Sequence, residues 1–483
     1  MKKNFYITTT LPYVNADPHI GFALEIVQAD VIARYHQFIK GDEVIFNTGT
    51  DEHGVKIYRK AIEAKQEPQD YVDSYAAKFN KLKKSLNLSY TNFTRTSNND
   101  HKKAAQEFWM RCFRNGDIEK RFSKISYCSG CELEKMASEL IDGQCPDHPN
   151  LKLDFIEEEN YFFIFSKYKN PLLDLYKKNP HFVVPDFRFN EIKKFIEQGP
   201  ADFSISRLKE KMPWGIPVPN DPNHVMYVWF DALINYISTL GWPEDKGKFE
   251  EFWPGVQVAG KDNLRQQSAT WQAMLLSAGL PNSKQIFIHG FIITGNQKMS
   301  KSLGNVINPF TLVKKYGTDP VRYYLLRHIN PFEDSNFTIE KFEELYTADL
   351  TNGLGNLVSR IAGLVEQSEL NIDKLLINHK LDLLKSNDSL DKIIEEFRFD
   401  KFLSRIWRMV KEIDEDISKD TPWQLIKEHK DDVLLDCLKN YVTKILFIAY
   451  CLQPCLPSTS KKITKIFSAK KIKKGKPLFP RLQ

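Results

Sequence analysis

The apolar residues in the first part of the chain fall into short continuous runs that end in polar turns. Residues 5–10 (FYITTT) and 43–47 (EVIFN) are rich in β-branched and aromatic side chains, which is typical of buried strands. Residues at helical spacing follow these runs, over about 22–38, 58–86 and 101–115. Buried strands that alternate with helices predict an α/β domain built on a parallel sheet.

The pattern returns in the second half of the chain and then changes. Apolar runs at 225–230, 256–259 and 285–289 predict further strands, and we expect a helix over about 266–278. From about residue 339 onward, leucine and isoleucine recur every three or four residues, which predicts an α-helical bundle. We therefore expect a doubly wound parallel sheet of the Rossmann type, split by an insertion and followed by an all-α bundle.

Length and composition narrow the class of protein. A chain of 483 residues is too long for one core, so we expect roughly two to four domains. Apolar residues make up 42% of the chain, but they form no run of about 18 residues, so no membrane span is expected. The N-terminal residues enter the first strand without the apolar core of a signal peptide. The net charge of +6 permits a nucleic-acid partner without requiring one, and we expect a cytoplasmic protein.

Three cysteines and a histidine stand at the spacing of metal ligands. Cys128 and Cys131 form C-x2-C, and after thirteen residues Cys145 and His148 form C-x2-H. Three thiolates and one imidazole make a closed tetrahedral zinc site with no coordination position open for catalysis. We therefore predict one structural Zn²⁺ per chain, the alternative being four unrelated residues. The remaining cysteines are expected to be reduced and mostly buried: Cys112, Cys437, Cys451 and Cys455.

Two polar motifs that follow predicted strands suit the binding of phosphate. His19 and Gly21 open the first predicted helix, where N–H groups and the helix dipole face an anion. Lys298, Ser300 and Lys301 lie in the run KMSKS, after the strand at 285–289. Two ammonium groups on a loop at a strand end can meet charge that develops on a polyphosphate. Either motif alone is also compatible with an ordinary polar turn.

Asp51 stands at the end of the second predicted strand, in the sequence GTDEHG. Because ligands of doubly wound sheets bind beyond the carboxyl ends of the strands, this carboxylate is well placed to meet a cation such as an amino group. The alternative is that Asp51 caps the helix that follows.

The two phosphate motifs together resemble the signature pair of class I aminoacyl-tRNA synthetases. The wider sequence resembles the methionyl-tRNA synthetase family, from about residue 4 to the end. The segments that carry this resemblance are TLPYVN at 10–15, GTDEHG at 49–54, WGIPVP at 214–219, YVWFDAL at 227–233, GKD at 260–262 and DLTNGLGNLVSR at 349–360.

The resemblance implies domain boundaries and the roles of residues. It implies a catalytic domain in two parts, 1–115 and 223–338, an insertion of the single-zinc form at 116–222, and an anticodon-binding helical domain at 339–483. The second catalytic part would end in a short linking fold. Residues implied to bind methionine are Leu11, Tyr13, Asp51, Trp229, Ala232, Leu233, Tyr236 and Gln267. Those implied to bind ATP are His19, Gly21, Phe22, Gly260, Asp262, Lys298, Ser300 and Lys301, of which His19, Lys298 and Lys301 would be catalytic.

The implied anticodon readers are Asn356, Arg360 and Trp423. Asn356 and Arg360 lie four residues apart on a predicted helix and therefore project together. An amide and a guanidinium can hydrogen-bond the edges of unstacked bases, and an indole can stack on them. Without the resemblance, each residue is an ordinary cap, surface or core residue. The lysine-rich segment 461–476 would either contact the tRNA backbone or form a solvated helix face.

The implied reaction has two steps. The carboxylate of methionine attacks the α-phosphate of ATP, with Mg²⁺ accompanying ATP, and the methionyl group then passes to the 3′ end of tRNA(Met). Both initiator and elongator tRNA(Met) are expected partners. The C-terminal dimerisation module of some relatives has no counterpart before residue 483, so we expect a monomer.

Three positions depart from the family pattern. Phe22 stands where the first motif normally ends in a second histidine, and Phe cannot donate to a phosphate. Gln267 replaces a usual histidine near the methionine pocket, although an amide can still donate and accept hydrogen bonds. Gln272 stands where a proline is usual.

These departures keep other functions open. One is another class I synthetase, for isoleucine, valine, leucine or cysteine, although the insertion of roughly a hundred residues is short for an editing domain. Another is a non-catalytic RNA-binding relative whose site has decayed. A third is a small-molecule nucleotidyltransferase that shares the His-x-Gly motif, in which case the helical domain and the zinc insertion would lack a purpose.

Overall fold

The structure is a computed structural model that describes residues 3–130, 133–134, 140–146, 149–295, 297–298, 306–372 and 390–482. Its centre is a six-stranded sheet in the order β3-β2-β1-β12-β13-β7, in which all neighbours are parallel. The strands are β1 (Asn4–Thr9), β2 (Glu43–Thr50), β3 (Asn92–Arg95), β7 (Val183–Val184), β12 (Val256–Gly260) and β13 (Gln285–His289). The order reverses beside β1, as the prediction of a doubly wound sheet requires.

Helices cover both faces of this sheet because its central strands are apolar on both sides. In β1, Phe5 and Ile7 face one buried cluster and Tyr6 faces the other, as the two-residue period of a strand dictates. The first cluster includes α1 (Ile20–Arg34), α3 (Pro68–Asn80) and α4 (Leu82–Ser85). The second includes α5 (Asn99–Arg114), α9 (Asn235–Ser238), α10 (Lys246–Phe252) and α11 (Trp271–Ser277). A short helix, α2 (Val55–Glu63), follows β2.

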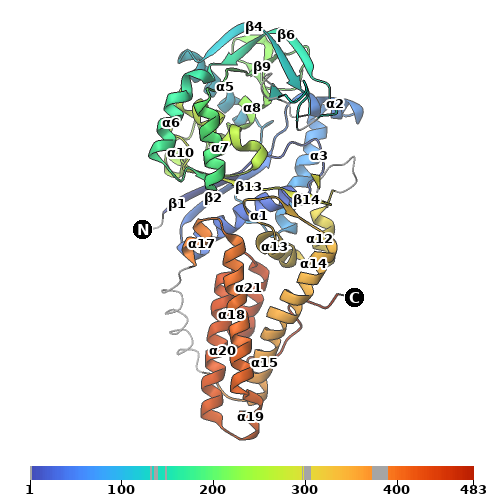
Figure 1. Ribbon diagram of the computed structural model, residues 1–483, viewed down its shortest axis with the longest axis vertical. Coiled ribbons are helices and arrows are strands. Elements are labelled where there is room, and N and C mark those ends of the chain that lie inside the picture. Colours follow the sequence, from blue (N-terminus) through green and yellow to red (C-terminus); the bar gives the residue numbers. More distant parts are fainter. Residues whose placement is uncertain are drawn as a thin grey trace.

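The range predicted as an insertion forms the end of the molecule opposite the helical bundle (Figure 1). It contains a four-stranded antiparallel sheet in the order β5-β4-β6-β8. These strands are β4 (Ile118–Cys128), β5 (Leu133–Glu134), β6 (Asp154–Phe163) and β8 (Phe203–Ser204), with the helices α6 (Lys169–Lys178) and α7 (Asp186–Glu197) beside them. Strand β7 lies in the same range of the chain but pairs with β13 at the edge of the parallel sheet.

The predicted strand at 225–230 is wrong in part. Strand β11 (Asp221–Met226) ends earlier, and it pairs with β9 (Ser206–Leu208) and β10 (Pro217–Val218) in a separate antiparallel sheet. Trp229 and Phe230 lie in a short helix, α8 (Val228–Ala232). This helix is buried on almost all sides, so its residues are as apolar as those of a buried strand. The apolar run alone therefore does not distinguish a helix from a strand here. Asp231, which follows this run, is a fully buried residue within α8.

The remaining boundaries differ from prediction by a few residues. Helix α1 begins at Ile20 rather than Phe22, and a π-helical turn, η1 (Tyr35–Lys40), continues it. The helix expected at 266–278 is a π-helical turn, η5 (Gln266–Thr270), followed by α11. A small sheet joins β14 (Ile292–Thr294), β15 (Gln297–Lys298) and β16 (Ser335–Asn336).

The C-terminal region is the predicted helical bundle, which extends away from the sheet (Figure 1). Its elements are α14 (Ile339–Leu345), η7 (Tyr346–Gly355), α15 (Asn356–Ser368), α17 (Asp391–Glu395), α18 (Phe399–Asp420), α19 (Pro422–Lys427), α20 (Asp431–Leu452) and α21 (Pro457–Phe467). The segment after Phe467 is not helical, and its Phe479 packs against Gly355 and Tyr346. A helix face therefore accounts only for the first three lysines of segment 461–476.

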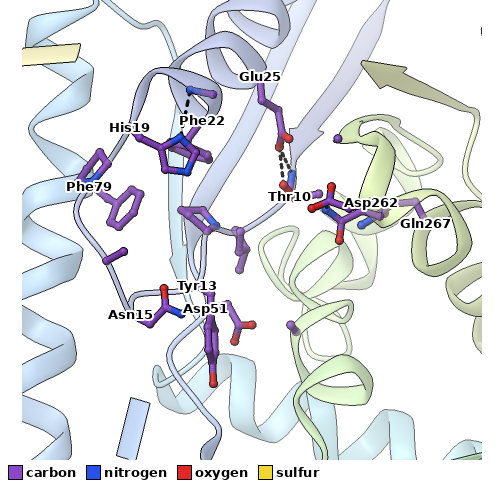
Figure 2. A pocket seen from close by; sticks show the side chains of 18 of the residues that line it. Thr10, Tyr13, Asn15, His19, Phe22, Glu25, Asp51, Phe79, Asp262 and Gln267 are labelled. Carbon is purple, nitrogen blue, oxygen red and sulfur yellow. Dashed lines mark hydrogen bonds between the residues drawn. The ribbon is translucent and has the colours of Figure 1, made fainter. Parts of the chain in front are cut away.

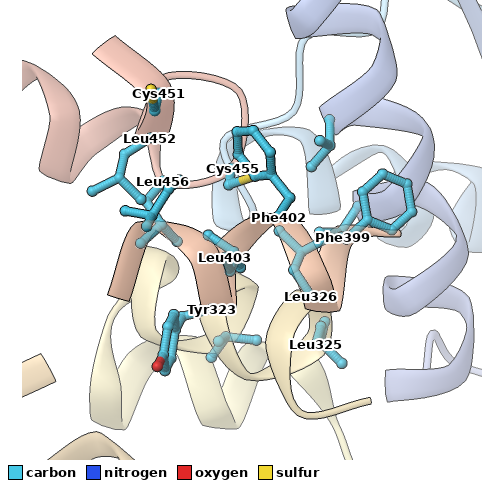
Figure 3. Packing of buried hydrophobic residues seen from close by; sticks show 14 of the residues in the cluster. Tyr323, Leu325, Leu326, Phe399, Phe402, Leu403, Cys451, Leu452, Cys455 and Leu456 are labelled. Atoms are coloured by element: carbon cyan, nitrogen blue, oxygen red, sulfur yellow. The ribbon is translucent and has the colours of Figure 1, made fainter. Parts of the chain in front are cut away.

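The bundle is joined to the parallel sheet by α12 (Pro309–Tyr316) and α13 (Thr318–Arg327). Side chains of α18 pack between α13 and the end of α20 (Figure 3). The guanidinium of Arg322 is fully buried; it pairs with Asp30 of α1 at 2.8 Å and donates to the carbonyl of Cys455 at 2.7 Å. A buried charge is retained only where it is paired and hydrogen-bonded, so this residue ties the two parts of the chain together.

Within the described ranges, every helix is too short or too polar to cross a bilayer.

Candidate active site

A cavity of about 430 Å³ opens at the carboxyl ends of β1, β2, β12 and β13 (Figure 2). This is the point at which the strand order reverses, where doubly wound sheets bind ligands. All the residues predicted to hold the amino acid line this cavity: Leu11, Tyr13, Asp51, Trp229, Ala232, Leu233, Tyr236 and Gln267. So do five of the residues predicted to hold the nucleotide: His19, Gly21, Phe22, Gly260 and Asp262.

One side of the cavity is formed by the start of α1. His19 is the N-cap, and its Nδ1 accepts a hydrogen bond from the backbone N–H of Gly21 at 3.1 Å. The imidazole is exposed at the cavity, beside the N-terminal end of a 15-residue helix. Phe22 points toward the same space and packs edge-on against Phe79, with ring centroids 5.4 Å apart (Figure 2). This side therefore combines a helix N-terminus, which favours anions, with an apolar aromatic wall.

Asp51 is held at the end of β2 by backbone bonds to the segment that follows β1. Its N–H donates to the carbonyl of Pro12 at 3.0 Å, and its carbonyl accepts from the N–H of Val14 at 3.2 Å. The residue is 8% exposed and lines the cavity. Helix α2 begins at Val55 with Gly54 as its N-cap, so the alternative that Asp51 caps this helix is wrong.

The packing of the Tyr13 side chain beside this segment requires a glycine at position 54. Its φ of 119° lies outside the range that other residues adopt readily, and a Cβ there would lie 2.4 Å from the hydroxyl oxygen of Tyr13. The bare backbone lets the Tyr13 ring stand beside Asp51.

The opposite wall comes from α8, α9 and η5, which contribute Trp229, Ala232, Leu233, Tyr236 and Gln267. Tyr236 is 2% exposed and Gln267 1%. The Nε2 of Gln267 donates to the hydroxyl of Tyr236 at 2.6 Å. This part of the cavity is mostly apolar and aromatic, with few polar groups, and it can therefore hold an apolar, polarizable side chain.

Asp231 lies behind this wall, between two histidines. Its carboxylate oxygens lie 2.6 Å from Nδ1 of His53 and 2.7 Å from Nε2 of His101. Burial by itself disfavours the carboxylate, but the charge of His53 and the hydrogen bonds of both imidazoles lower the pKa of Asp231 to about 2. The ionised group fixes α8, and with it Trp229 and Ala232, against the segment that follows β2 and against α5.

Comparison with known proteins shows similarity to this chain in both sequence and structure. The family model of class I tRNA synthetases (M) matches residues 5–154 and 149–362. The chain belongs to this family of class I tRNA synthetases. Methionine–tRNA ligase of Thermotoga maritima is 39% identical over 474 residues, which cover 95% of this chain and 74% of that protein. The ligase of Nostoc is 38% identical over 96% of this chain and 89% of its own length. The methionyl-tRNA synthetase of Mycobacterium tuberculosis in complex with methionyl-adenylate superposes with a TM-score of 0.89 at 31% identity, covering 100% and 99% of the two chains.

The synthetase motif KMSKS lies at the limit of the described residues. The backbone of Lys298 pairs with Ile293 of β14, and Ile292 of the same strand lines the cavity. Ser300 and Lys301 lie outside the described residues.

Two residues of the synthetase cavity were missed from the sequence. Glu25 of α1 accepts from the N–H and the hydroxyl of Thr10, at 2.8 and 2.5 Å, and its other oxygen lies 3.0 Å from Nε2 of His289. Although burial disfavours the imidazolium, the Glu25 carboxylate raises the pKa of His289. His289 ends the predicted strand at 285–289, so the rule that ligands bind at strand ends could have found it.

The predicted metal ligands are partly described. Cys128 ends β4, and Cys145 follows a turn closed by the bridge between Ile141 and Gln144. Both cysteines are fully buried, whereas Ile141 beside them is 65% exposed. Two buried thiols in an otherwise exposed segment suit a shared metal ion. Cys131 and His148 lie outside the described residues, so the four-ligand site stays a prediction.

The structure brings together two of the three predicted anticodon residues. The guanidinium carbon of Arg360 lies 5.5 Å from the ring centroid of Trp423, and Nη1 donates to Asp414 at 2.7 Å. Trp423 is 39% exposed. Asn356 is exposed one turn earlier in α15. A half-buried guanidinium and an exposed indole at the far end of the bundle can receive a base.

Proposed function

We propose that the chain is a methionine–tRNA ligase, which converts methionine and ATP to methionyl-adenylate and transfers the methionyl group to tRNA. The observation that carries this proposal is the composition of one cavity. An apolar, aromatic half that contains a buried carboxylate adjoins a half formed by a histidine and a helix N-terminus. The relatives named methionine–tRNA ligase support it.

The amino acid would bind in the half that contains Asp51. The carboxylate of Asp51, which lines the cavity, would pair with the ammonium group, because opposite charges attract strongly at a largely buried position. The thioether would lie against Tyr13, Trp229 and Tyr236, since sulfur contacts aromatic rings favourably. A polar side chain would lose its hydrogen bonds with water there, which disfavours it.

ATP would extend from Gly260 toward the start of α1. Gly260 leaves its backbone bare, and a Cβ there would lie 2.8 Å from Oδ1 of Asp262, so a side chain would displace the Asp262 carboxylate. A nucleoside could therefore approach the backbone there. The phosphates would meet His19, the N–H groups at the start of α1, and the lysines at 298 and 301.

In the first step, a carboxylate oxygen of methionine forms a bond to the α-phosphorus, and the bond from that phosphorus to the bridging oxygen breaks. Pyrophosphate leaves with the electron pair. The residues of this chain would act by alignment and by charge: Asp51 orients the amino acid, and His19, Lys298 and Lys301 stabilise the leaving group. Mg²⁺ would accompany ATP and offset part of the phosphate charge.

In the second step, the 3′-terminal hydroxyl of tRNA attacks the methionyl carbonyl, and AMP leaves. Asn356, Arg360 and Trp423 would read the anticodon at the far end of the bundle. We further propose that the enzyme serves initiator and elongator tRNA(Met) as a monomer in the cytoplasm.

The assay for this function is the charging of tRNA(Met) transcripts with radiolabelled methionine. Wild-type protein should charge both tRNA(Met) forms and leave a transcript for another amino acid uncharged. Lys301→Ala should reduce charging by about 10²–10³-fold, the cost of losing one preorganised donor to a developing anion. Lys246→Ala, at an exposed position in α10, is the matched control. A Lys301→Ala rate near that of the control would refute the role of this lysine.

We also propose that Cys128, Cys131, Cys145 and His148 hold one structural Zn²⁺. Metal analysis of the purified chain should find about one zinc per molecule, because four protein ligands close the site. Cys145→Ser should lower both the zinc content and the Tm, whereas Cys437→Ser, at a half-buried cysteine of the bundle, should leave the zinc content unchanged. A zinc-free wild-type protein with an unchanged Tm after chelation would refute the site.

A further inference from the structure

Behind the wall of the cavity, four buried polar side chains form one continuous series of hydrogen bonds that ends at Tyr236. They are Gln257 of β12, Gln267 of η5, Gln272 of α11 and Ser283 of the loop before β13. All four are at most 5% exposed. Only Gln267 lines the cavity. A buried amide can turn over by half a rotation, so its partners decide which end faces the substrate.

The backbone fixes the direction of this series at its far end. The N–H of Ser283, which can only donate, bonds Oε1 of Gln272 at 3.0 Å. Nε2 of Gln272 donates to the carbonyl of Gln267 at 2.8 Å and to Oγ of Ser283 at 3.0 Å. Gln272 is therefore held in one orientation by two backbone groups, and Oγ of Ser283 must accept from it.

The direction then passes from residue to residue. Oγ of Ser283 donates its own proton to Oε1 of Gln257 at 2.5 Å. If Oγ accepted from Gln257 as well, this buried proton would have no acceptor among the described residues. That leaves Nε2 of Gln257 to donate to Oε1 of Gln267 at 3.2 Å. Nε2 of Gln267 in turn donates to the hydroxyl of Tyr236 at 2.6 Å.

Tyr236 is thus an acceptor toward Gln267, and its own proton remains to be donated. Among the described residues, the structure shows no acceptor for this proton. Burial raises the pKa of Tyr236, with a smaller opposing effect from the Gln267 hydrogen bond, so the phenol keeps its proton. The cavity is the place where an acceptor can arrive.

We propose that Gln272, Ser283 and Gln257 are positioning residues that hold the Gln267 amide in one orientation, so that Tyr236 presents its proton to the sulfur of the bound amino acid. This inference rests on the proposed function, because methionine supplies the sulfur as a weak acceptor. It assigns a role to Gln267 and Gln272 at two positions where this chain departs from the family pattern.

The test compares methionine with norleucine, in which a methylene replaces the sulfur. The readout is the ratio of kcat/KM for the two amino acids in ATP–pyrophosphate exchange. In Gln257→Glu, the ionised carboxylate would attract Nε2 of Gln267, turn this amide over and draw the Tyr236 proton to Oε1. At pH 8.5 the ratio should fall about 3- to 10-fold, the loss of one modest hydrogen bond. The kcat/KM for norleucine should hardly change.

The pH profile separates this role from a structural one. Burial raises the pKa of a carboxyl group, and a protonated Glu at 257 again donates to Gln267. The ratio for Gln257→Glu should therefore recover at pH 6, while the wild-type ratio stays flat. Other titratable groups also act on Tyr236: Glu25 and Asp51 through their charges, and Tyr6, whose hydroxyl donates to the Tyr236 carbonyl. The wild-type pH profile records the effect of these groups on the ratio, and the profile of Gln257→Glu is compared with it.

Two further variants complete the design. Ser283→Ala breaks the series without adding charge and should lower the ratio about 2- to 3-fold at every pH. Gln285→Glu, the same exchange on the neighbouring strand β13, should leave the ratio unchanged. Wild-type ratios in both Gln257→Glu at pH 8.5 and Ser283→Ala would refute this inference alone. A wild-type protein with no methionine-dependent exchange would refute the proposed function and this inference with it.

Discussion

Replacing Asp51 by Asn should damage the binding of the amino acid far more than that of ATP. Asp51 is 8% exposed, and backbone hydrogen bonds to Pro12 and Val14 hold the residue in place at the cavity. Opposite charges about 4 Å apart attract by about 4 kcal/mol at an effective dielectric constant of 20. The amide retains a neutral hydrogen bond worth about 1 kcal/mol.

The difference, after some offset for desolvation of the carboxylate, is about 2–3 kcal/mol. At 1.36 kcal/mol per factor of ten, kcat/KM for methionine should fall about 30- to 150-fold. The assay is ATP–pyrophosphate exchange with methionine and ATP varied separately, and the KM for ATP should change by less than about 3-fold. Asp17→Asn is the matched control, because Asp17 lines the same cavity but is exposed and pairs with Lys78 at 2.8 Å.

A ligand that lacks the amino group distinguishes an effect of Asp51 on the ammonium group from an effect on the shape of the cavity. The desamino analogue of methionine, 4-(methylthio)butanoate, should inhibit wild-type and Asp51→Asn proteins equally. If the variant lost affinity for this analogue as strongly as for methionine, Asp51 would act on the shape of the cavity and not on the ammonium group.

Three further predictions follow from the bundle, the nucleotide side and the buried carboxylate. Arg360→Ala should lower tRNA charging by about 10- to 150-fold, the cost of one base contact, without changing pyrophosphate exchange; Arg405→Ala at an exposed site of α18 is the control, and equal losses would contradict anticodon reading. Phe22→His should accelerate adenylation by adding a donor at the phosphates, while loss of the aromatic pair with Phe79 costs about 1 kcal/mol of stability; an unchanged exchange rate would show that this position does not contact the phosphates. The pKa of Asp231 is lowered from 3.8 to about 2, so its stabilising effect is present above pH 3.8 and is lost as the pH falls toward 2. Urea unfolding should show wild-type protein more stable than Asp231→Asn by about 2 kcal/mol at pH 7, with the difference shrinking across that window; a constant difference would contradict the assignment.

The parallel sheet could be predicted because burial on both faces leaves a direct trace in the sequence. Strands β1, β2, β12 and β13 are short apolar runs that end at polar turns, and the turns carry the residues that meet in the cavity. The run at 225–230 misled because a short helix buried nearly all round has no polar face to reveal its period. Strand β7 has only two residues, too few for any pattern.

The contacts that complete the site could not be predicted, because they depend on three-dimensional proximity. Glu25 and His289 are 264 residues apart in the chain, and Gln257 faces Gln267 only once β12 and η5 are packed together. Single polar residues within an apolar strand or an amphipathic helix look like ordinary solvent-facing positions. Motif spacing found the residues at strand ends and helix starts, but it gave no sign of the polar groups behind them.

Amino-acid-dependent ATP–pyrophosphate exchange, measured with each of the standard amino acids in turn, tests the central claim most directly. The account predicts exchange with methionine, at least tenfold faster than with any other amino acid, because the cavity combines an apolar aromatic half with the Asp51 carboxylate. Exchange that is faster with another amino acid would contradict the assignment of the pocket. A folded, zinc-loaded protein that exchanges with none would contradict the assignment as an active synthetase and favour an RNA-binding relative.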